Sequence, residues 1–347
     1  MAINVTKPSV NLREKLNELE TNKGLKGNEI LQAETAQEVR SLIGAGRKNL
    51  IINGDFDVWQ RGTSFTPTAA NPYTADRWRV YQSSSSNVTV TKRTESTSSS
   101  VPFINYIRID NTIDADTSWI ELNQYVEDYS HLINNTVTLS FWAKASYDIQ
   151  DGYTYTNSGT SSGVYAITTS WTKYQVTLDL KAGTVASNGY LRLLLGTKTS
   201  VNADSYIDYA QVQLELGSVA TDFEHRSYGE ELALCQRYFQ KSYTDGIYAG
   251  TNTTVGIVIV NGSTEGGSSS YQYYTYPVPM RAAASITFYN SSGASGVWQG
   301  NSSPSSSATR TVALDYSGTA GFYFHVGLVN TWVVCQIYGH FTADAEL

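Results

Sequence analysis

The sequence predicts a mainly β protein with short N-terminal helices, a central jelly-roll β-sandwich, a connecting helix and a small C-terminal β-sandwich. From Asn49 onward, apolar and polar residues alternate with a period of two, which is typical of half-buried strands. The chain has 25 Tyr and 27 Gly residues among long Ser/Thr tracts, a composition typical of short strands and turns. No helical crossovers separate the candidate strands, which excludes a parallel βαβ sheet. A length of 347 residues predicts several domains. We place them at 1–48, 49–227, 228–243 and 244–347.

The N-terminal region is predicted to form two short helices. Leu12, Leu16 and Leu19 have the spacing of seam positions in a brief coiled coil. A second helix is expected between Thr35, its N-cap, and Gly44, which ends it. With so little apolar core, this region is expected to become ordered against another protein or against copies of itself.

The central region is predicted to contain about ten strands separated by Ser, Gly, Asn and Asp turns. So many short strands in one region predict a two-sheet sandwich or a jelly roll. The candidate strands are 49–59, 76–81, 87–93, 103–110, 118–127, 136–145, 164–169, 172–180, 190–196 and 206–216.

The segment "GEELALCQRYFQKSY", residues 229–243, has the pattern of one amphipathic helix. Its apolar arc includes Leu232, Cys235 and Phe239. A helix of about three turns needs packing partners. Two interpretations remain open: a connector that lies on the nearest sheet, or a joint between two β domains that bundles with copies of itself from neighbouring chains.

The C-terminal region is predicted to form a small sandwich of six strands with long polar loops. The two cysteines, Cys235 and Cys335, each lie within a predicted apolar face, so we expect buried free thiols. The candidate strands are 254–260, 271–276, 284–289, 309–314, 321–327 and 332–341.

The charge and hydropathy of the chain argue against two classes of partner. The net charge is -7, whereas nucleic acids and anionic lipid surfaces require clustered Lys and Arg. No apolar run approaches the 18 residues of a membrane span, and the N-terminus lacks a signal-peptide core. We expect no nucleic-acid binding, no membrane insertion and synthesis in a cytoplasm.

Motifs for catalysis are lacking. None of the four histidines lies in a recognisable motif, and a nucleophile elbow, a zinc-protease motif and a phosphate-binding glycine loop are all missing. A two-carboxylate glycosidase remains an alternative, with Asp114, Asp116 and Glu121 as candidates. Solvated turn carboxylates explain these residues better, so we predict a protein that is not an enzyme.

Aromatic residues on the polar sides of strands are the candidate glycan-binding residues. Alternation turns Trp142 outward on one strand, and Trp119, Glu121 and Tyr125 outward on another. Sugar C–H faces stack on such rings while amides and carboxylates bind hydroxyls. The alternative is packing beneath a loop or against a neighbouring subunit. The C-terminal candidates, of which alternation places about half in the core, are Tyr271, Tyr273, Tyr274, Tyr276 and Trp298.

Two carboxylates form a candidate cation site. Asp55 follows the first predicted strand of the jelly roll and Asp208 lies within the last, and a jelly roll brings these strands together. Calcium prefers hard oxygen ligands of this kind. We expect no other cofactor.

Several segments resemble the tail fibres or receptor-binding proteins of tailed bacteriophages. The resemblance spans about residues 49–290, and the central part is also similar to jelly-roll carbohydrate-binding modules. The segment "TAQEVRSLIGAG" resembles helical repeats at the virion-proximal ends of fibres. The segments that carry the resemblance are "NLIINGDFDVWQRGTSF", "YTADRWRVY", "LSFWAKAS", "YIDYAQVQLELGSVATDFEHRSYGEELALCQRYFQKSY" and "YPVPMRAAASITFYN".

This resemblance implies a homotrimer in the virion, with residues 1–48 attached to a tail protein and a C-terminal tip that contacts a host surface glycan or lipopolysaccharide. It also implies a structural calcium, which Asp208 and the turn at Asp55 match loosely. Ala284 stands where the family usually has a proline. The expected function is host attachment, with a polysaccharide depolymerase or a structural connector as alternatives. The trimer-interface candidates are Leu12, Leu16, Leu19, Leu232, Cys235 and Phe239.

Overall fold

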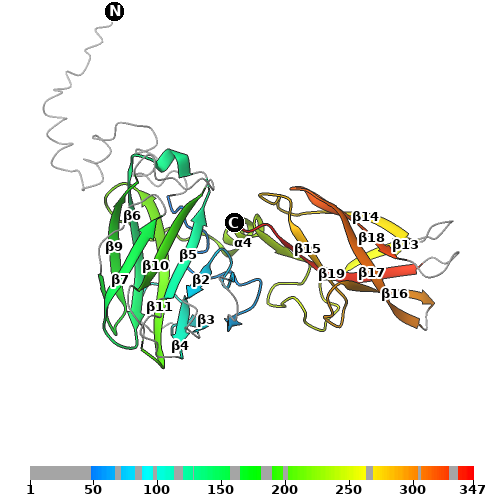
Figure 1. Cartoon of the computed structure of the whole chain (residues 1–347), viewed down its shortest axis with the longest axis horizontal. Coiled ribbons are helices and arrows are strands. Elements are labelled where there is room, and N and C mark those ends of the chain that lie inside the picture. Colours follow the sequence, from blue (N-terminus) through cyan, green and yellow to red (C-terminus); the bar gives the residue numbers. More distant parts are fainter. Residues whose placement is uncertain are drawn as a thin grey trace, which may run out of the picture. The chain divides into compact units, whose positions relative to one another are not determined.

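The computed structural model divides the chain into two units, residues 1–50 and 51–347, of which the second contains all the described helices and strands (Figure 1). The predicted N-terminal helices, with Leu12, Leu16 and Leu19, lie outside the described residues. So do Asp114, Asp116 and Trp119. The described residues are 48–66, 72–82, 88–96, 100–112, 120–127, 129–156, 165–180, 190–197, 202–262, 269–303, 306–327 and 335–347.

The first part of the larger unit is a sandwich of two antiparallel sheets, which confirms the predicted β-sandwich. Most consecutive strands lie in different sheets, as in a jelly roll. The β11 sheet has the order β1 (Ser64–Phe65), β3 (Val88–Thr94), β4 (Asn105–Asn111), β11 (Ser205–Leu216), β6 (Thr136–Ala145) and β9 (Thr172–Asp179). The β5 sheet has the order β2 (Arg79–Gln82), β5 (Ile120–Val126), β10 (Leu191–Thr197), β7 (Ile149–Thr156) and β8 (Tyr165–Ile167).

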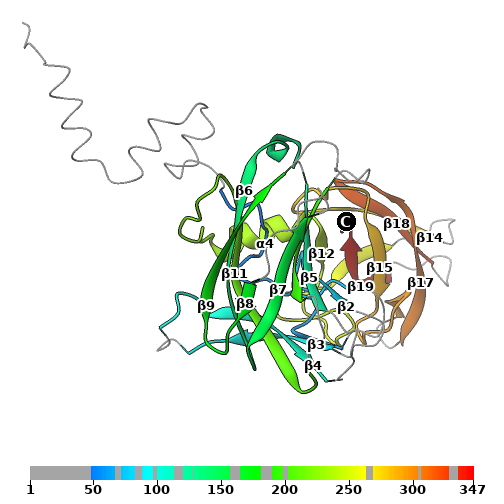
Figure 2. The ribbon, with the colours of Figure 1, turned by 60° about the vertical axis from the view of Figure 1, so that its left-hand side comes forward.

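The core of the sandwich is formed by alternate residues of both sheets. In β6, Val137, Leu139 and Phe141 are buried as the period of two predicts. The ring of Phe141 lies 5.4 Å from the ring of Tyr165, which belongs to the other sheet. Figure 2 shows the two sheets as separate layers. Burying each large apolar side chain contributes about 1.5–3 kcal/mol, so this interior stabilises the sandwich.

The predicted strand 49–59 is wrong. These residues form a turn in which Asn53 and Phe56 have positive φ angles of 58° and 54°. The Asn53 amide donates to the carbonyl oxygens of Val58 and Asp76, at 2.8 and 3.0 Å. Asparagine tolerates the left-handed region because its side chain can bond the local backbone, and these bonds replace the pairing of a strand.

The connecting segment begins as a helix but does not continue as one. Helix α4 (Tyr228–Gln236) starts at a capping box formed by Ser227 and Glu230. The prediction that the helix extends to residue 243 is wrong, because Phe239–Lys241 form strand β12. Backbone pairing with a distant strand stabilises β12 in place of further helical turns. No helix in the described segments is long and apolar enough to cross a membrane.

The C-terminal region is a single antiparallel strand path that curls around one core. Its order is β12, β19 (Cys335–Asp344), β16 (Val297–Ser303), β17 (Ser306–Ser317), β18 (Gly321–Gly327) and β14 (Ser269–Thr275), while β13 (Val258–Gly262) and β15 (Ser285–Tyr289) both pair with β19. Tyr274 of β14 and Phe341 of β19 have ring centroids 4.6 Å apart although three strands separate them in the sheet. The two layers of the predicted sandwich are therefore parts of one folded sheet.

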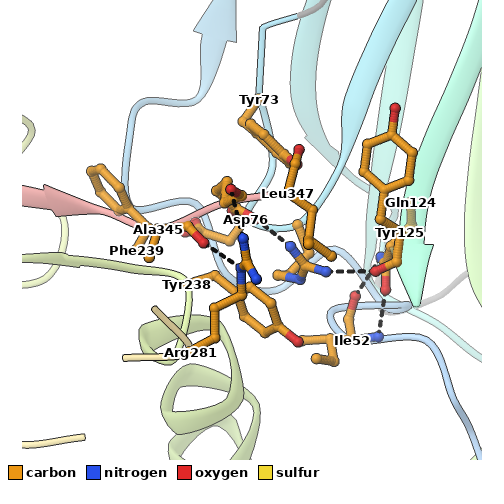
Figure 3. Close-up of polar contacts among 12 residues, drawn as sticks. Ile52, Tyr73, Asp76, Gln124, Tyr125, Tyr238, Phe239, Arg281, Ala345 and Leu347 are labelled. Atoms are coloured by element: carbon orange, nitrogen blue, oxygen red, sulfur yellow. Dashed lines mark hydrogen bonds and ion pairs between the residues drawn. The ribbon is translucent and has the colours of Figure 1, made fainter. Parts of the chain in front are cut away.

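Charged and aromatic side chains join the sandwich to the C-terminal sheet (Figure 3). The Arg77 guanidinium lies 3.4 Å from the centre of the Tyr238 ring and pairs with the carboxylate of Glu346. Arg61 lies 3.7 Å from the centre of the next ring, Phe239. The Arg77 and Glu346 side chains are at most 3% exposed, so the buried Arg77 depends on Glu346 for its countercharge, while Glu346 also pairs with Arg61. The connecting segment therefore acts within the chain, as the support on which two sandwich arginines stack.

Candidate functional site

Three neighbouring strands of the C-terminal sheet present aromatic rings to solvent. We call this surface the tyrosine face and define it by six residues. On β14 and β18, Tyr271 lies opposite His325 and Tyr273 opposite Tyr323, so these side chains share one side of the sheet. On β17, Tyr316 lies opposite Tyr323. The six residues are Tyr271, Tyr273, Asp315, Tyr316, Tyr323 and His325.

The rings of the tyrosine face are open in the single chain. Tyr271 is 55% exposed, Tyr273 56% and Tyr316 75%. Tyr323 lies between them, with ring centroids 6.0 Å from Tyr271 and 6.5 Å from Tyr316, and the ring planes differ by 17° and 28°. Three nearly parallel rings therefore extend across three strands. Large rings that remain this exposed contribute little to folding, and contiguous exposed aromatic surface is typical of a binding site.

Strand alternation explains why these rings face outward. In β18, Phe322, Phe324 and Val326 are buried in the core, so Tyr323 and His325 must point to the other side. The sequence "GFYFHVG" thus encodes both a core side and a solvent-facing side.

A β-bulge in β17 places one additional side chain on this face. Leu314 pairs with Phe324 and Tyr316 with Tyr323, so Asp315 is the extra residue of the bulged strand. Bulges redirect side chains and are frequent beside functional sites. Here the bulge brings a carboxylate to the face without removing the neighbouring tyrosine.

Asp315 and His325 form the polar centre of the face. The His325 Nδ1 lies 2.9 and 3.0 Å from the two carboxylate oxygens of Asp315. The imidazole centroid lies 5.3 Å from that of Tyr271. Both side chains are partly exposed, 31% for His325 and 23% for Asp315. A ligand that stacks on the tyrosines would therefore meet an oriented imidazole.

The structure divides the C-terminal candidates predicted from sequence. Tyr271 and Tyr273 belong to the exposed face. Tyr276 is 5% exposed and Trp298 is fully buried, with its indole Nε1 donating to the His340 carbonyl, so the prediction that they bind glycan is wrong. Tyr274 is half-buried and packs inward against Phe341. The shape of the curled sheet turns these three rings into the core.

Sequence reasoning missed four residues of the face: Asp315, Tyr316, Tyr323 and His325. Alternation within "GFYFHVG" carries a signal for Tyr323 and His325, because every second residue of that strand is strongly apolar. Asp315 and Tyr316 follow the predicted strand 309–314, which in the structure continues to Ser317.

Trp142 of the sandwich is not an open ring. It is half-buried and packs 5.9 Å from Phe103, in a cluster that also includes Tyr106 and Trp171. Trp171 contacts Phe103 edge-on at 4.7 Å and donates through Nε1 to Glu95. Packing beneath a loop, the alternative that the sequence left open, describes this residue.

Glu121 and Tyr125 lie on the β5 sheet among polar partners. The Arg192 guanidinium donates to the Glu121 carboxylate and to the Asn123 amide oxygen, both at 2.7 Å. Glu121 is only 8% exposed. Tyr125 packs edge-on against Tyr190 at 4.5 Å. This face is thus a bonded network rather than an open surface of rings.

The two carboxylates predicted to share a calcium ion have different surroundings. Asp208 is fully buried and accepts two hydrogen bonds from Arg108, at 2.8 and 2.9 Å, so its charge is already neutralised. Asp55 lies 3.6 Å from His225. Among the residues with described placement, no group of three or more His, Cys, Asp or Glu side chains could hold a metal ion. A calcium site shared by Asp55 and Asp208 does not fit these contacts.

The trimer-interface candidates of the connecting segment have different exposures. Cys235 is fully buried and Phe239 is 5% exposed in the single chain, where Phe239 lies beneath Arg61. The prediction that Cys235 and Phe239 contact neighbouring copies is therefore wrong, because both side chains lie in the interior of their own chain. Leu232 is half-buried, and its role between subunits stays a prediction.

Comparisons with known proteins give structural likeness alone. No family model and no curated protein matches the sequence. Among solved structures, the carbohydrate-binding module TmCBM61 bound to β-1,4-galactotriose is 15% identical, with 49% of this chain and 100% of the module covered and a TM-score of 0.33. The enzymatically active domain of tailspike protein 4 of bacteriophage CBA120 is 15% identical, and the match covers 49% of this chain and 21% of that chain with a TM-score of 0.31. A cyclase from Fischerella sp. TAU is 13% identical, and the match covers 51% of this chain and 100% of the cyclase with a TM-score of 0.35.

Proposed function

We propose that the protein is a non-enzymatic glycan-binding protein that attaches to carbohydrate surfaces through the tyrosine face. The single observation that carries this proposal is the row of rings across β14, β18 and β17, in which Tyr271, Tyr273 and Tyr316, each more than half exposed, flank the partly exposed Tyr323. Tyrosine supplies a large rigid contact area and loses little conformational entropy on binding. Its ring stacks on sugar C–H faces, and its hydroxyl bonds sugar hydroxyls.

The charge of the region favours a neutral ligand. Residues 244–347 contain two basic and five acidic residues. Of the two arginines, Arg281 donates to the Ala345 carbonyl and Arg310 is 7% exposed. An anionic polymer would therefore find no free guanidinium on the tyrosine face, whereas a neutral sugar needs none.

The finer proposal is a tail fibre of a bacteriophage that presents this face to a host surface glycan. It is supported by the resemblance of the sequence segments to tail fibres, including the run through the connecting helix. In this proposal residues 1–48 bind a tail protein of the virion, and the chain is a homotrimer. Three weak sites presented together would bind as one strong site through their high effective concentration. Light scattering of the full chain tests the oligomeric state, and a monomer at micromolar concentration would contradict it.

Binding to defined sugars tests the main proposal. The probes are neutral hexose oligomers of the cello-, malto- and galacto- series, each titrated calorimetrically into the full chain. We expect at least one series to bind, and Tyr271→Ala and Tyr316→Ala each to weaken binding about tenfold, since loss of one stacked ring costs about 1.4 kcal/mol. Tyr228→Ala is the matched control because Tyr228 is also exposed, at 42%, and lies on α4 outside the face. Equal binding by the wild type and both face variants would reject the face as the binding site.

A polysaccharide depolymerase is the second candidate, favoured by the His325–Asp315 pair beside the rings. An imidazole held by a carboxylate is the arrangement that a general base uses. Incubation of the same neutral oligomers with the chain, followed by a reducing-end assay, separates the two functions. Release of reducing ends that Asp315→Asn abolishes would establish the enzyme and overturn the non-enzymatic proposal.

A further inference from the structure

From the geometry of the tyrosine face, we infer that His325 is its specificity-determining residue and that it recognises a hydroxyl group of an uncharged sugar. The inference depends on the proposed function, because it names the polar contact made by a ligand that stacks on the tyrosines. It assigns His325 the contact and Asp315 a positioning role.

The contact follows from which nitrogen of the imidazole is already used. Nδ1 lies at hydrogen-bond distance from both carboxylate oxygens of Asp315. A carboxylate accepts hydrogen bonds, so in the neutral imidazole the proton resides on Nδ1 and Nε2 carries a lone pair. Nε2 is therefore an acceptor, and a sugar hydroxyl is a donor of matching chemistry.

The position of the imidazole supports contact with a stacked ligand. His325 pairs directly across the sheet with Tyr271, and the two ring centroids lie 5.3 Å apart. The imidazole is about a third exposed, whereas the side chains on either side of it in β18, Phe324 and Val326, are buried. A sugar ring on Tyr271 would thus place its edge hydroxyls near the imidazole.

The same arrangement disfavours acidic sugars. The Asp315 carboxylate lies beside the imidazole, and the bulge in β17 holds it on the exposed side. A uronate would bring a second negative charge to this carboxylate and to a nitrogen that accepts rather than donates. Like charges at close range disfavour binding. Discrimination between a neutral and an acidic sugar of equal length is therefore expected.

Two variants and one spectroscopic measurement test the inference. His325→Ala should weaken binding of the neutral hexose oligomer up to about tenfold, because it removes one hydrogen bond to the ligand. Asp315→Asn should weaken binding several-fold, because an amide can donate to Nδ1 and leave the proton on Nε2. The ¹⁵N shifts of the imidazole report this proton directly. We expect an unprotonated Nε2 in the wild type and a shift toward a protonated Nε2 in Asp315→Asn.

Polygalacturonate oligomers of the same length provide the charge test. We expect these acidic oligomers to bind the wild type at least tenfold more weakly than the neutral oligomer does. Their affinity should increase again in the Asp315→Asn variant. His225→Ala is the matched control, because His225 also lies beside a carboxylate but belongs to the sandwich. Circular dichroism of every variant checks the fold.

The outcomes separate this inference from the proposed function. If no neutral oligomer binds the wild type, the proposed function fails. If neutral oligomers bind and Tyr271→Ala loses binding while His325→Ala and Asp315→Asn bind as the wild type does, the proposed function stands and the role of His325 is overturned. A protonated Nε2 in the neutral wild-type imidazole would also overturn it.

Discussion

Substitution of Asp55 by asparagine should stabilise the protein at pH 8. Burial, with smaller contributions from the charges of Asp57 and Glu231, raises the pKa of Asp55 from 3.8 to about 7. Its Oδ1 is buried and has no hydrogen-bond partner within the described part of the chain. The ionised carboxylate is therefore poorly solvated, and a neutral amide of nearly the same shape removes this cost.

The direction in which the stability of the folded chain changes with pH follows from the raised pKa of Asp55. Below about pH 4, Asp55 is protonated in the folded and the unfolded chain. Between pH 4 and 7 the folded chain keeps a proton that the unfolded chain has lost, so the stabilisation present at low pH is lost as the pH rises toward 7. A rise of about three pKa units corresponds to about 4 kcal/mol. Because the side chain is 23% exposed, solvent screening should reduce the observed effect to about 2 kcal/mol.

Guanidinium denaturation of the full chain at pH 5 and pH 8 measures the effect. We expect Asp55→Asn to raise the free energy of unfolding by about 2 kcal/mol at pH 8 and by less at pH 5. Asp179→Asn is the control, since this exposed carboxylate on β9 accepts a hydrogen bond from Thr136 at the surface. An Asp55→Asn variant that is less stable than the wild type at pH 8 would refute the reasoning.

Three further predictions concern the core and the contacts between sandwich and C-terminal sheet. Glu346→Gln should lower the free energy of unfolding by about 3–5 kcal/mol in denaturant titration, because Arg77 stays buried without its countercharge. Adding Arg77→Met to the same chain should restore part of this free energy. Gly339→Ala should lower the same quantity by about 1–3 kcal/mol, because a Cβ there would lie 2.3 Å from Cδ1 of Trp298, whereas Gly229→Ala, which meets no atom within 4 Å, should not. Burial raises the pKa of the Cys235 thiol, so in a Cys335→Ser chain Ellman's reagent should react only after denaturant is added; rapid reaction with the native chain would show that the thiol is accessible.

Local patterns predicted the strands well where one side of the strand is apolar. The alternation in "TVTLSFWAKA" predicts residues 136–145, which are the bounds of β6. The pattern is missing in β7 (Ile149–Thr156), whose centre is "QDGYT", so alternation predicts no strand there. It is held between β10 and β8, and at Gly152 a Cβ would lie 2.7 Å from the Tyr165 ring. Pairing with distant strands, rather than its own hydrophobicity, makes this segment a strand.

Non-local pairing also limits the prediction of the connecting segment and the site. The helical pattern of 229–243 is interrupted because Phe239 pairs with Asp344, more than a hundred residues away. Tyr271 and Tyr273 could be predicted as candidates from composition and alternation. Asp315 could not, because the bulge that exposes it is defined by a mismatch between β17 and β18. Such a mismatch has no signal in either strand alone.

Strand β19 pairs with β12, β13, β15 and β16, and all four precede it in the sequence. During synthesis these partners leave the ribosome without the strand that joins them, so the C-terminal sheet cannot close until residues 335–344 have emerged. Contacts between residues so far apart in sequence form slowly, since a long loop must be ordered first. The nascent chain therefore exposes its unpaired strand edges for the whole of this interval, and a chaperone that shields them would have its main effect before residues 335–344 emerge.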